Sequence, residues 1–147
     1  MKEIIKAGSE SDLLTCYEVL HELRPHLTKE TFVSTLTGFM NRGYHLIYVE
    51  ENGKAVCALG YRFTEHLLWG KAIYIDDLST LPEARGKGYA SLLLQHIFDV
   101  AGQNKCDEVH LDSGCGANRY DAHRLYLNAG FDITSHHFAY KVKSMLN

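Results

Sequence analysis

Apolar residues recur at every second position in some segments of this chain and at every third or fourth position in others. The order of these segments predicts the secondary structure. Alternating or β-branched runs predict strands at 2–6, 44–49, 55–63, 72–80, 109–113 and 136–143. Apolar residues at helical spacing predict helices at about 12–24, 29–42, 91–101 and 122–129. Strands therefore alternate with helices, and consecutive strands occur as well.

Residues with special backbone preferences mark the ends of several elements. Ser9 or Ser11 is expected to cap the first helix, which Pro25 prevents from continuing. Thr28 is expected to cap the second helix. Asn52-Gly53 separates two strands and is typical of a tight type I′ hairpin, so these strands are expected to be antiparallel.

This order of elements predicts the fold class. Strand–helix–strand crossovers favour parallel pairing and hairpins give antiparallel pairing, so we expect a mixed α/β fold. Its central mixed sheet is expected to have six to seven strands, with helices on both faces. With 147 residues and neither repeat nor linker, the chain is expected to form one domain over residues 1–147.

Composition and charge narrow the classes of function. The residues are 46% hydrophobic and 22% charged, and the formal net charge of -3 argues against general binding to nucleic acid or to an anionic membrane. No apolar run of about 18 residues occurs, and Lys2, Glu3 and Lys6 interrupt the N-terminal segment where a signal peptide would be apolar. We therefore expect a cytoplasmic enzyme.

Neither the cysteines nor the histidines predict a metal site. The four cysteines form no C-x-x-C pair, and His136 and His137 are neighbouring strand residues that would point to opposite faces. Cys115 is interpreted as a free thiol in a loop, because no paired histidine and aspartate accompany it as a nucleophile would require. We predict no metal cofactor.

A glycine-rich turn joins the fourth predicted strand to the third predicted helix. It reads Arg85-Gly86-Lys87-Gly88-Tyr89-Ala90. Glycines let a ligand approach the backbone, the first amides of a helix lack partners, and the helix dipole adds about half a positive charge there. Arg85 and Lys87 add full charges. The turn is therefore a candidate phosphate site, although its spacing is neither that of a dinucleotide-binding loop nor that of a Walker loop.

The turn and a second segment resemble the GNAT family of N-acetyltransferases. The Arg-x-x-Gly-x-Ala spacing of residues 85–90 is similar to the family's pyrophosphate-binding signature. Residues 122–131, AHRLYLNAGF, resemble its A-x-x-L-Y-x-x-x-G-F segment. The motifs stand in the family's order, and the resemblance covers residues 72–131 well. It implies transfer of an acetyl group from acetyl-CoA to a primary amine.

The resemblance also implies which residues hold acetyl-CoA. The amides of Gly86, Lys87, Gly88, Tyr89 and Ala90, with the side chains of Arg85 and Lys87, would bind the diphosphate. A bulge around Leu78 and Ser79 would splay the fourth strand from the fifth, so that free amides at Leu78 and Thr80 bind the pantetheine arm and the acetyl oxygen.

A departure from the family occurs before the last helix. Many members have an asparagine three residues before the alanine that is Ala122 here, and it contacts the pantetheine. This chain has Arg119 at that place and Asn118 one position earlier. Either the helix starts differently or another group makes the contact.

Tyr126 matches the family's tyrosine that protonates the leaving thiolate. A phenol and a thiol differ in pKa by about two units, so the proton transfer is reasonable. On spacing alone Tyr126 would more often be a core residue, because it lies on the apolar stripe of its helix, and the resemblance is what favours the catalytic role.

Asp76 and Asp77 are candidates for the base, directly or through a water. Adjacent strand residues face opposite sides, so only one is expected to address the acceptor, and Asp76 is slightly favoured because it matches a glutamate of polyamine-type members. A carboxylate with a pKa near about 4 is a poor base for an ammonium near about 10, so a water relay or a raised pKa would be needed. Alternatively, both carboxylates only attract the cationic acceptor.

We therefore predict an acetyl-CoA-dependent N-acetyltransferase that works by direct attack in a ternary complex on a small amine rather than a protein. A homodimer is compatible with this prediction. The alternative is a non-catalytic regulatory domain that binds acyl-CoA. Residues 119–127 are similar to the aminoalkylphosphonate N-acetyltransferase branch, which would suit an amine carrying an anion, although Arg119 and Arg124 would equally be exposed helix charges. The acceptor pocket is expected between residues 21–42 and 65–71.

Overall fold

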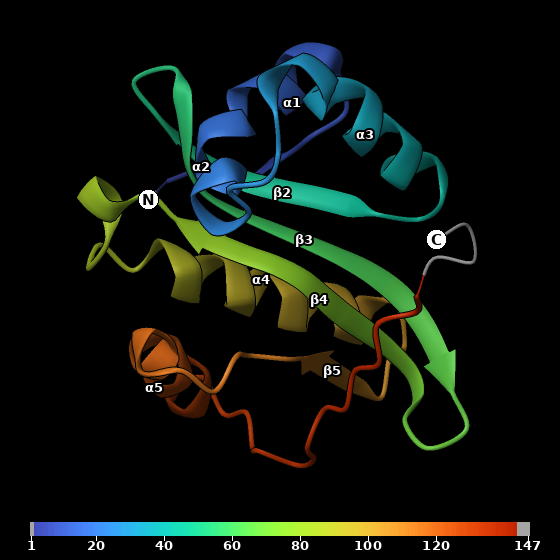
Figure 1. The fold of residues 1–147 in the computed structure, drawn as a ribbon. Coiled ribbons are helices and arrows are strands. Elements are labelled where there is room, and N and C mark those ends of the chain that lie inside the picture. Colours follow the sequence, from blue (N-terminus) through green and yellow to red (C-terminus); the bar gives the residue numbers. More distant parts are fainter. Residues whose placement is uncertain (1, 144–147) are drawn as a thin grey trace. The chain divides into compact units, whose positions relative to one another are not determined.

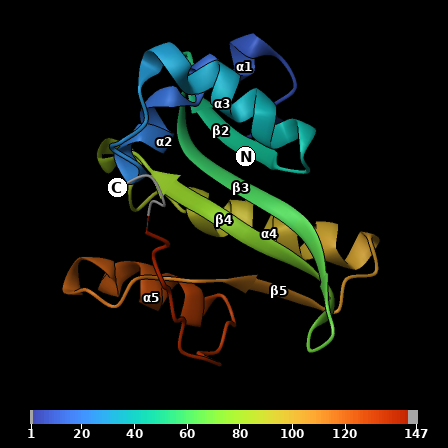
Figure 2. The same cartoon turned by 45° about the vertical axis from the view of Figure 1, so that its right-hand side comes forward.

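The structure, a computed structural model, describes residues 2–143 (Figures 1 and 2). Backbone contacts divide the chain into two compact units, residues 1–111 and 112–147, which are described separately. The first unit contains, in chain order, β1 (Ile5–Lys6), α1 (Glu10–Thr15), α2 (Tyr17–Leu23), α3 (Lys29–Asn41), β2 (His45–Glu51), β3 (Lys54–His66), β4 (Gly70–Thr80), the 3₁₀-helix η1 (Pro82–Ala84), α4 (Tyr89–Gln103) and β5 (Glu108–Leu111). The second unit contains the 3₁₀-helix η2 (Ala117–Arg119) and α5 (Tyr120–Asn128).

The sheet is mixed, as the order of elements predicts. Its strands follow one another in the order β1-β2-β3-β4-β5, with antiparallel pairing as far as β4 and parallel pairing between β4 and β5. The α4 helix makes the crossover between the two parallel strands, which a parallel pair requires. The mixed α/β class is therefore confirmed.

The expected strand count of six to seven is too high, because the residues described form five strands. Residues 136–143 were expected to close the sheet, but residues 132–143 form neither helix nor strand. Phe138, Tyr140 and Val142 alternate as strand residues do, yet each is at least 82% exposed. Alternation alone therefore misled the prediction, since a strand also needs a partner that buries one of its faces.

The core of the first unit lies on both faces of the sheet. Figures 1 and 2 show α1, α2 and α3 on one face and α4 on the other. Residues 55–61 of β3 are buried without interruption, as expected for a strand covered on both sides. The helices contribute fully buried side chains from each side, including Val19, Phe32, Leu93 and Ile97.

Several predicted boundaries are confirmed and one is corrected. Ser9 caps α1 through a capping box with Asp12, and Thr28 precedes α3, although its hydroxyl pairs with Thr31 rather than with a backbone amide. The single helix expected before Pro25 is two helices, because the chain bends at the buried Cys16. Asn52 and Gly53 both have positive φ, 52° and 83°, which confirms the type I′ hairpin.

Candidate functional site

The glycine-rich turn keeps its backbone accessible. Gly86 and Gly88 have φ of 79° and 82°, a left-handed conformation that favours glycine, and a Cβ at either would meet no atom within 4 Å. Gly88 is the N-cap of the 15-residue α4 and offers no side chain to the first amides. These amides are therefore oriented to bind an anion outside the helix.

Both cations of this turn already face a carboxylate. The Arg85 guanidinium lies 3.7 Å from Glu22, and Lys87 Nζ lies 3.3 Å from Glu51 Oε1. The Tyr89 hydroxyl donates to the other carboxylate oxygen of Glu51, which lowers the pKa of Glu51 and raises that of Tyr89. Glu51 therefore stays charged beside the turn, and a bound diphosphate would compete with it for Lys87.

The predicted bulge occurs in β4, but earlier than expected. Gly60 of β3 pairs with Asp77 and Tyr61 pairs with Ile75, so Asp76 is the extra residue. The bulge is thus at Asp76 and not around Leu78 and Ser79, which pair regularly with β3.

The parallel pairing of β4 with β5 ends beside the bulge, between Ile75 and Leu111. Beyond that point, residues 77–80 pair with β3, and no other strand of the described chain pairs with them. This segment includes Leu78, Ser79 and Thr80. One of its edges pairs with β3, and the amides predicted to bind pantetheine would lie on the opposite edge. Ser79 is buried, and the Thr80 hydroxyl lies 3.3 Å from Cys57 Sγ.

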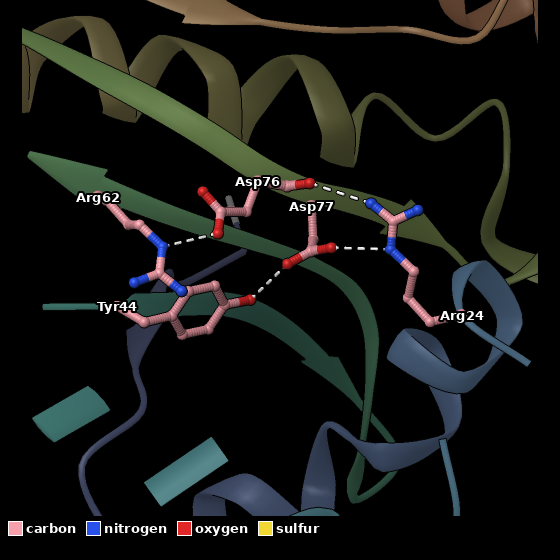
Figure 3. A network of polar contacts seen from close by, with 5 residues as sticks. All are labelled: Arg24, Tyr44, Arg62, Asp76 and Asp77. Atoms are coloured by element: carbon pink, nitrogen blue, oxygen red, sulfur yellow. Dashed lines mark hydrogen bonds and ion pairs between the residues drawn. The ribbon is translucent and has the colours of Figure 1, made fainter. Parts of the chain in front are cut away.

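Asp76 and Asp77 form a network with residues from three other segments (Figure 3). Asp77 accepts hydrogen bonds from Arg24 Nε at 3.0 Å and from the Tyr44 hydroxyl at 2.9 Å. Asp76 Oδ2 accepts from Arg62 Nε at 2.8 Å, while Oδ1 accepts none from any side chain of residues 2–143. Arg24 also binds the backbone carbonyl of Asp76 at 3.1 Å. Each carboxylate therefore has a fixed position and one arginine partner.

The expectation that these two aspartates face opposite sides is wrong. Arg62, which binds Asp76, lies over the Tyr44 ring at 5.3 Å, and Tyr44 binds Asp77. Both carboxylates thus belong to one cluster on the face that carries α2 and α3, as Figure 3 shows. The cause is the bulge, because one extra residue shifts the alternation of side chains by one position.

Gly60 makes this cluster sterically feasible. A Cβ at residue 60 would overlap the hydroxyl and the ring of Tyr44, which crosses β3 to reach Asp77. Tyr44 is 3% exposed. Its burial, and then the neighbouring Asp77, raise the pKa of Tyr44 well above the usual range, so the phenol remains a hydrogen-bond donor.

The sequence alone did not identify Arg24, Tyr44 or Arg62 as site residues. An isolated glycine inside a strand indicates a close approach of another group, so Gly60 carried a weak signal. Nothing in the local sequence indicates which side chain approaches. Glu51 was also missed, because its contact with Lys87 joins residues 36 positions apart.

The two segments expected to line the acceptor pocket, residues 21–42 and 65–71, lie at different distances from the aspartates. Residues 21–42 supply Arg24 to the cluster, and Phe39 lies under the guanidinium of Arg62 at 5.6 Å. The connection 65–71 lies at the other end of β4, six residues or about 20 Å from Asp76 along the strand. There, Trp69 stacks on His110 at 3.4 Å and Leu67 is fully exposed. Only the first part of the prediction therefore places residues near the aspartates.

Tyr126 belongs to the second unit. It is 8% exposed and packs edge-on against Phe131 at 5.9 Å. Burial raises the pKa of Tyr126, and the charge of Arg119 opposes this shift. Asn118 and Arg119 lie in η2, directly before α5. The assignment of Tyr126, Asn118 and Arg119 to one site with the residues of the first unit stays a prediction.

The second unit also contains a cysteine and a histidine that the sequence offered as candidates. Cys115 is exposed, and within residues 2–143 the His137 ring is near the carboxylate of Asp112, at 3.4 Å. Among residues 2–143, no three histidine, cysteine, aspartate or glutamate side chains form a group that could hold a metal ion. No helix in that part of the chain is long and apolar enough to cross a bilayer.

Comparisons with known proteins identify the family. The model of the acetyltransferase (GNAT) family matches residues 11–131. An uncharacterized N-acetyltransferase of Bacillus subtilis (strain 168), YhdJ, is 34% identical over 134 residues, which span 88% of this chain and 92% of that protein. This chain therefore belongs to the GNAT acetyltransferase family.

Solved structures share the fold. A putative acetyltransferase from Agrobacterium tumefaciens str. C58 superposes with a TM-score of 0.81 at 23% identity, over 95% of this chain and 99% of that one. The aminoglycoside N-acetyltransferase AAC(6')-Iy, solved in complex with CoA, superposes with a TM-score of 0.82 at 13% identity, over 98% and 96% of the two chains. At these identities the likeness concerns the fold alone.

Proposed function

We propose that this GNAT protein transfers an acetyl group from acetyl-CoA to the primary amine of a small molecule, by direct attack in a ternary complex. The observation that carries the proposal is the open, uncapped N-terminus of α4, preceded by two glycines in left-handed conformation. A cytoplasmic location and one domain over residues 1–147 stay predictions alongside it.

The residues at this turn fit the diphosphate of acetyl-CoA. The space above Gly86 and Gly88 is one that a Cβ would fill, and no described side chain caps the amides there. Arg85 and Lys87 are exposed and can turn from Glu22 and Glu51 toward a ligand, because surface ion pairs contribute only about 0–1 kcal/mol. When bound, acetyl-CoA supplies an activated acyl group and a thiol leaving group.

The chain's own residues would then hold the acceptor and move protons. Asp76 Oδ1 is the carboxylate oxygen without a side-chain donor, so it is available to accept a hydrogen bond from an ammonium. Asp77 accepts a hydrogen bond on each oxygen, from Arg24 and from Tyr44, and we assign it the positioning of Tyr44 and the bulge. The ammonium proton would leave through water held at Asp76. Tyr126, kept protonated by burial, would donate a proton to the departing thiolate.

A panel of amines tests this function. Purified protein is incubated with acetyl-CoA and each amine, released thiol is measured by a colorimetric reagent, and mass spectrometry identifies the acetylated product. We expect transfer to at least one small primary amine and a loss of kcat/KM of about 10- to 1,000-fold in Asp76→Asn. Binding of CoA without transfer to any amine would contradict the enzyme and leave the regulatory domain that binds acyl-CoA.

A further inference from the structure

Guanidinium groups outnumber carboxylates where α3 meets β3 and β4. Arg24 and Arg62 are paired with Asp77 and Asp76 respectively, whereas Arg42 forms no ion pair within residues 2–143. Three cations thus accompany two anions in a chain whose formal net charge is -3. This local excess of positive charge is opposite in sign to the charge of the whole chain.

Arg42 is exposed, and its guanidinium lies near the same aromatic ring as that of Arg62. Its guanidinium lies over the Phe39 ring at 5.6 Å and packs beside Gly38. The Arg62 guanidinium lies 5.6 Å from the centre of the same ring, so the two guanidinium carbons are at most about 11 Å apart. Two like charges therefore lie close to one aromatic ring.

The donors of this pair remain available to a ligand. A guanidinium has five N–H donors, and Arg62 uses only Nε, toward Asp76. The Arg42 side chain donates to no hydrogen-bond partner within the described chain, and Phe39 is 37% exposed. A planar guanidinium binds carboxylate and phosphate oxygens in pairs, which a lysine cannot do.

A structural role for Arg42 alone does not explain this arrangement. Arg42 is the C-cap residue of α3, where a cation interacts favourably with the helix dipole by about 0.3–1 kcal/mol. That interaction requires neither the ring nor a second guanidinium nearby. It also predicts an effect on stability rather than on acceptor choice, so the two roles can be separated.

We propose that Arg42 and Arg62 bind the anionic group of the acceptor, and that the acceptor is a small amine carrying a carboxylate, phosphate or phosphonate. Its ammonium would lie at Asp76, whose partner Arg62 joins the two ends of the site. Arg42 and Arg62 are then specificity-determining residues. This proposal rests on the proposed acetyl transfer and concerns residues other than Arg119 and Arg124.

Matched acceptors test the proposal. We compare 2-aminoethylphosphonate and β-alanine with propylamine and β-alanine amide, which carry the amine without the anion. We expect kcat/KM at least about tenfold higher for the anionic member of each pair, since a charge-assisted contact contributes about 1.5–3 kcal/mol. The phosphonate and carboxylate arms identify which anion is preferred.

Variants of Arg42 assign the effect to this site. Arg42→Gln should lower kcat/KM for the anionic acceptors at least tenfold more than for the neutral ones, mainly through KM, and Arg42→Lys should fall between. Lys29→Gln is the matched control, because it removes the same charge at the other end of α3, about 20 Å away. It should leave the preference for anionic acceptors unchanged.

The outcomes are distinct. Equal use of neutral and anionic amines by the native enzyme, or an equal loss for both in Arg42→Gln, would overturn the anion site while the acetyltransferase stands. A preference unchanged in Arg42→Gln would likewise overturn it. No transfer to any amine, with CoA still bound, would remove both the proposed function and this site.

Discussion

The glycine-rich turn and the aspartate cluster on β4 are built in different ways. Residues 85–90 of the turn are contiguous, and the diphosphate binding proposed for them depends on backbone conformation and on one helix terminus. The cluster joins Arg24, Tyr44, Arg62, Asp76 and Asp77 from separate segments, and its shape depends on a bulge and on one missing side chain at residue 60. The first is therefore a local structure and the second is a product of packing.

This difference suggests a division of roles. A contiguous turn that offers backbone amides suits the part of acetyl-CoA that is the same in every reaction. A cluster assembled from long-range contacts changes whenever any of its segments changes, so it suits the acceptor. Variants in the two regions should accordingly affect different binding constants.

The largest expected effect is a loss of kcat in Tyr126→Phe, which tests the chemical step separately from binding at the turn or at the cluster. Tyr126→Phe removes the proposed proton donor and keeps the ring, so kcat should fall about 10² to 10⁴-fold with little change in CoA affinity. The measurement is kcat at saturating amine over a pH range, together with thermal melting. Tyr120→Phe, on the exposed start of α5, is the matched control and should keep its activity.

If Tyr126 is only a core residue, the phenylalanine variant should turn over within about threefold of the native enzyme. It would then lose about 1 kcal/mol of unfolding free energy through its hydroxyl contacts. That result would leave the departing thiolate without an identified proton donor.

The next effect tests whether the turn acts through its backbone. Gly88→Val should weaken CoA binding by about 100-fold or more, because the side chain fills the open space that the ligand needs. It also strains a residue with φ of 82°. Gly53→Val is the matched control, since Gly53 has φ of 83° and equally open surroundings.

Both variants should lose similar unfolding free energy, about 1–2 kcal/mol, and only Gly88→Val should lose CoA binding. Calorimetric titration and thermal melting measure the two quantities. Unchanged affinity in Gly88→Val, or an equal loss in Gly53→Val, would argue against the assignment of the diphosphate to this turn.

These two regions also differ in how well the sequence predicted them. The turn was predicted between β4 and α4, because glycine spacing and the start of a helix are local properties, although α4 begins at Tyr89, two residues earlier than expected. The mixed sheet and the type I′ hairpin were likewise predicted. The common orientation of Asp76 and Asp77 was not, because the position of a bulge depends on the register of β3 against β4. The partners of the aspartates lie 14 to 53 positions away in sequence, beyond any local pattern.

Gly60→Ala should affect the cluster and spare the turn. The added methyl group overlaps Tyr44, which has to move away from Asp77, so we expect a loss of about 1–3 kcal/mol in unfolding free energy. The KM for the amine should rise while CoA affinity stays within about twofold. Gly102→Ala is the control, since its Cβ would meet nothing within 4 Å in α4.

Denaturant unfolding and steady-state kinetics check this prediction. A Gly60→Ala protein as stable as the native one, with unchanged amine kinetics, would show that Tyr44 does not organise the cluster.

The smallest expected effect concerns the competition between Glu51 and the diphosphate. Glu51→Gln removes the carboxylate that holds Lys87 and Tyr89, so CoA should bind more tightly by up to about fivefold, the range of a surface ion pair. The gain should shrink at high salt because of screening. Glu65→Gln, an exposed glutamate near the other end of β3, is the charge control and should leave the affinity unchanged. Weaker binding in Glu51→Gln would instead make Glu51 part of the binding site.

The central claim is direct transfer between the two regions, and one single-turnover experiment tests it. Protein is mixed with an equimolar amount of acetyl-CoA labelled in the acetyl group, with and without an acceptor identified in the amine panel, and protein and small molecules are analysed by mass spectrometry. We predict labelled amine in proportion to the CoA released, and no labelled protein in either sample. Label on the protein, at Cys115 or elsewhere, that passes to the amine when it is added would contradict direct attack.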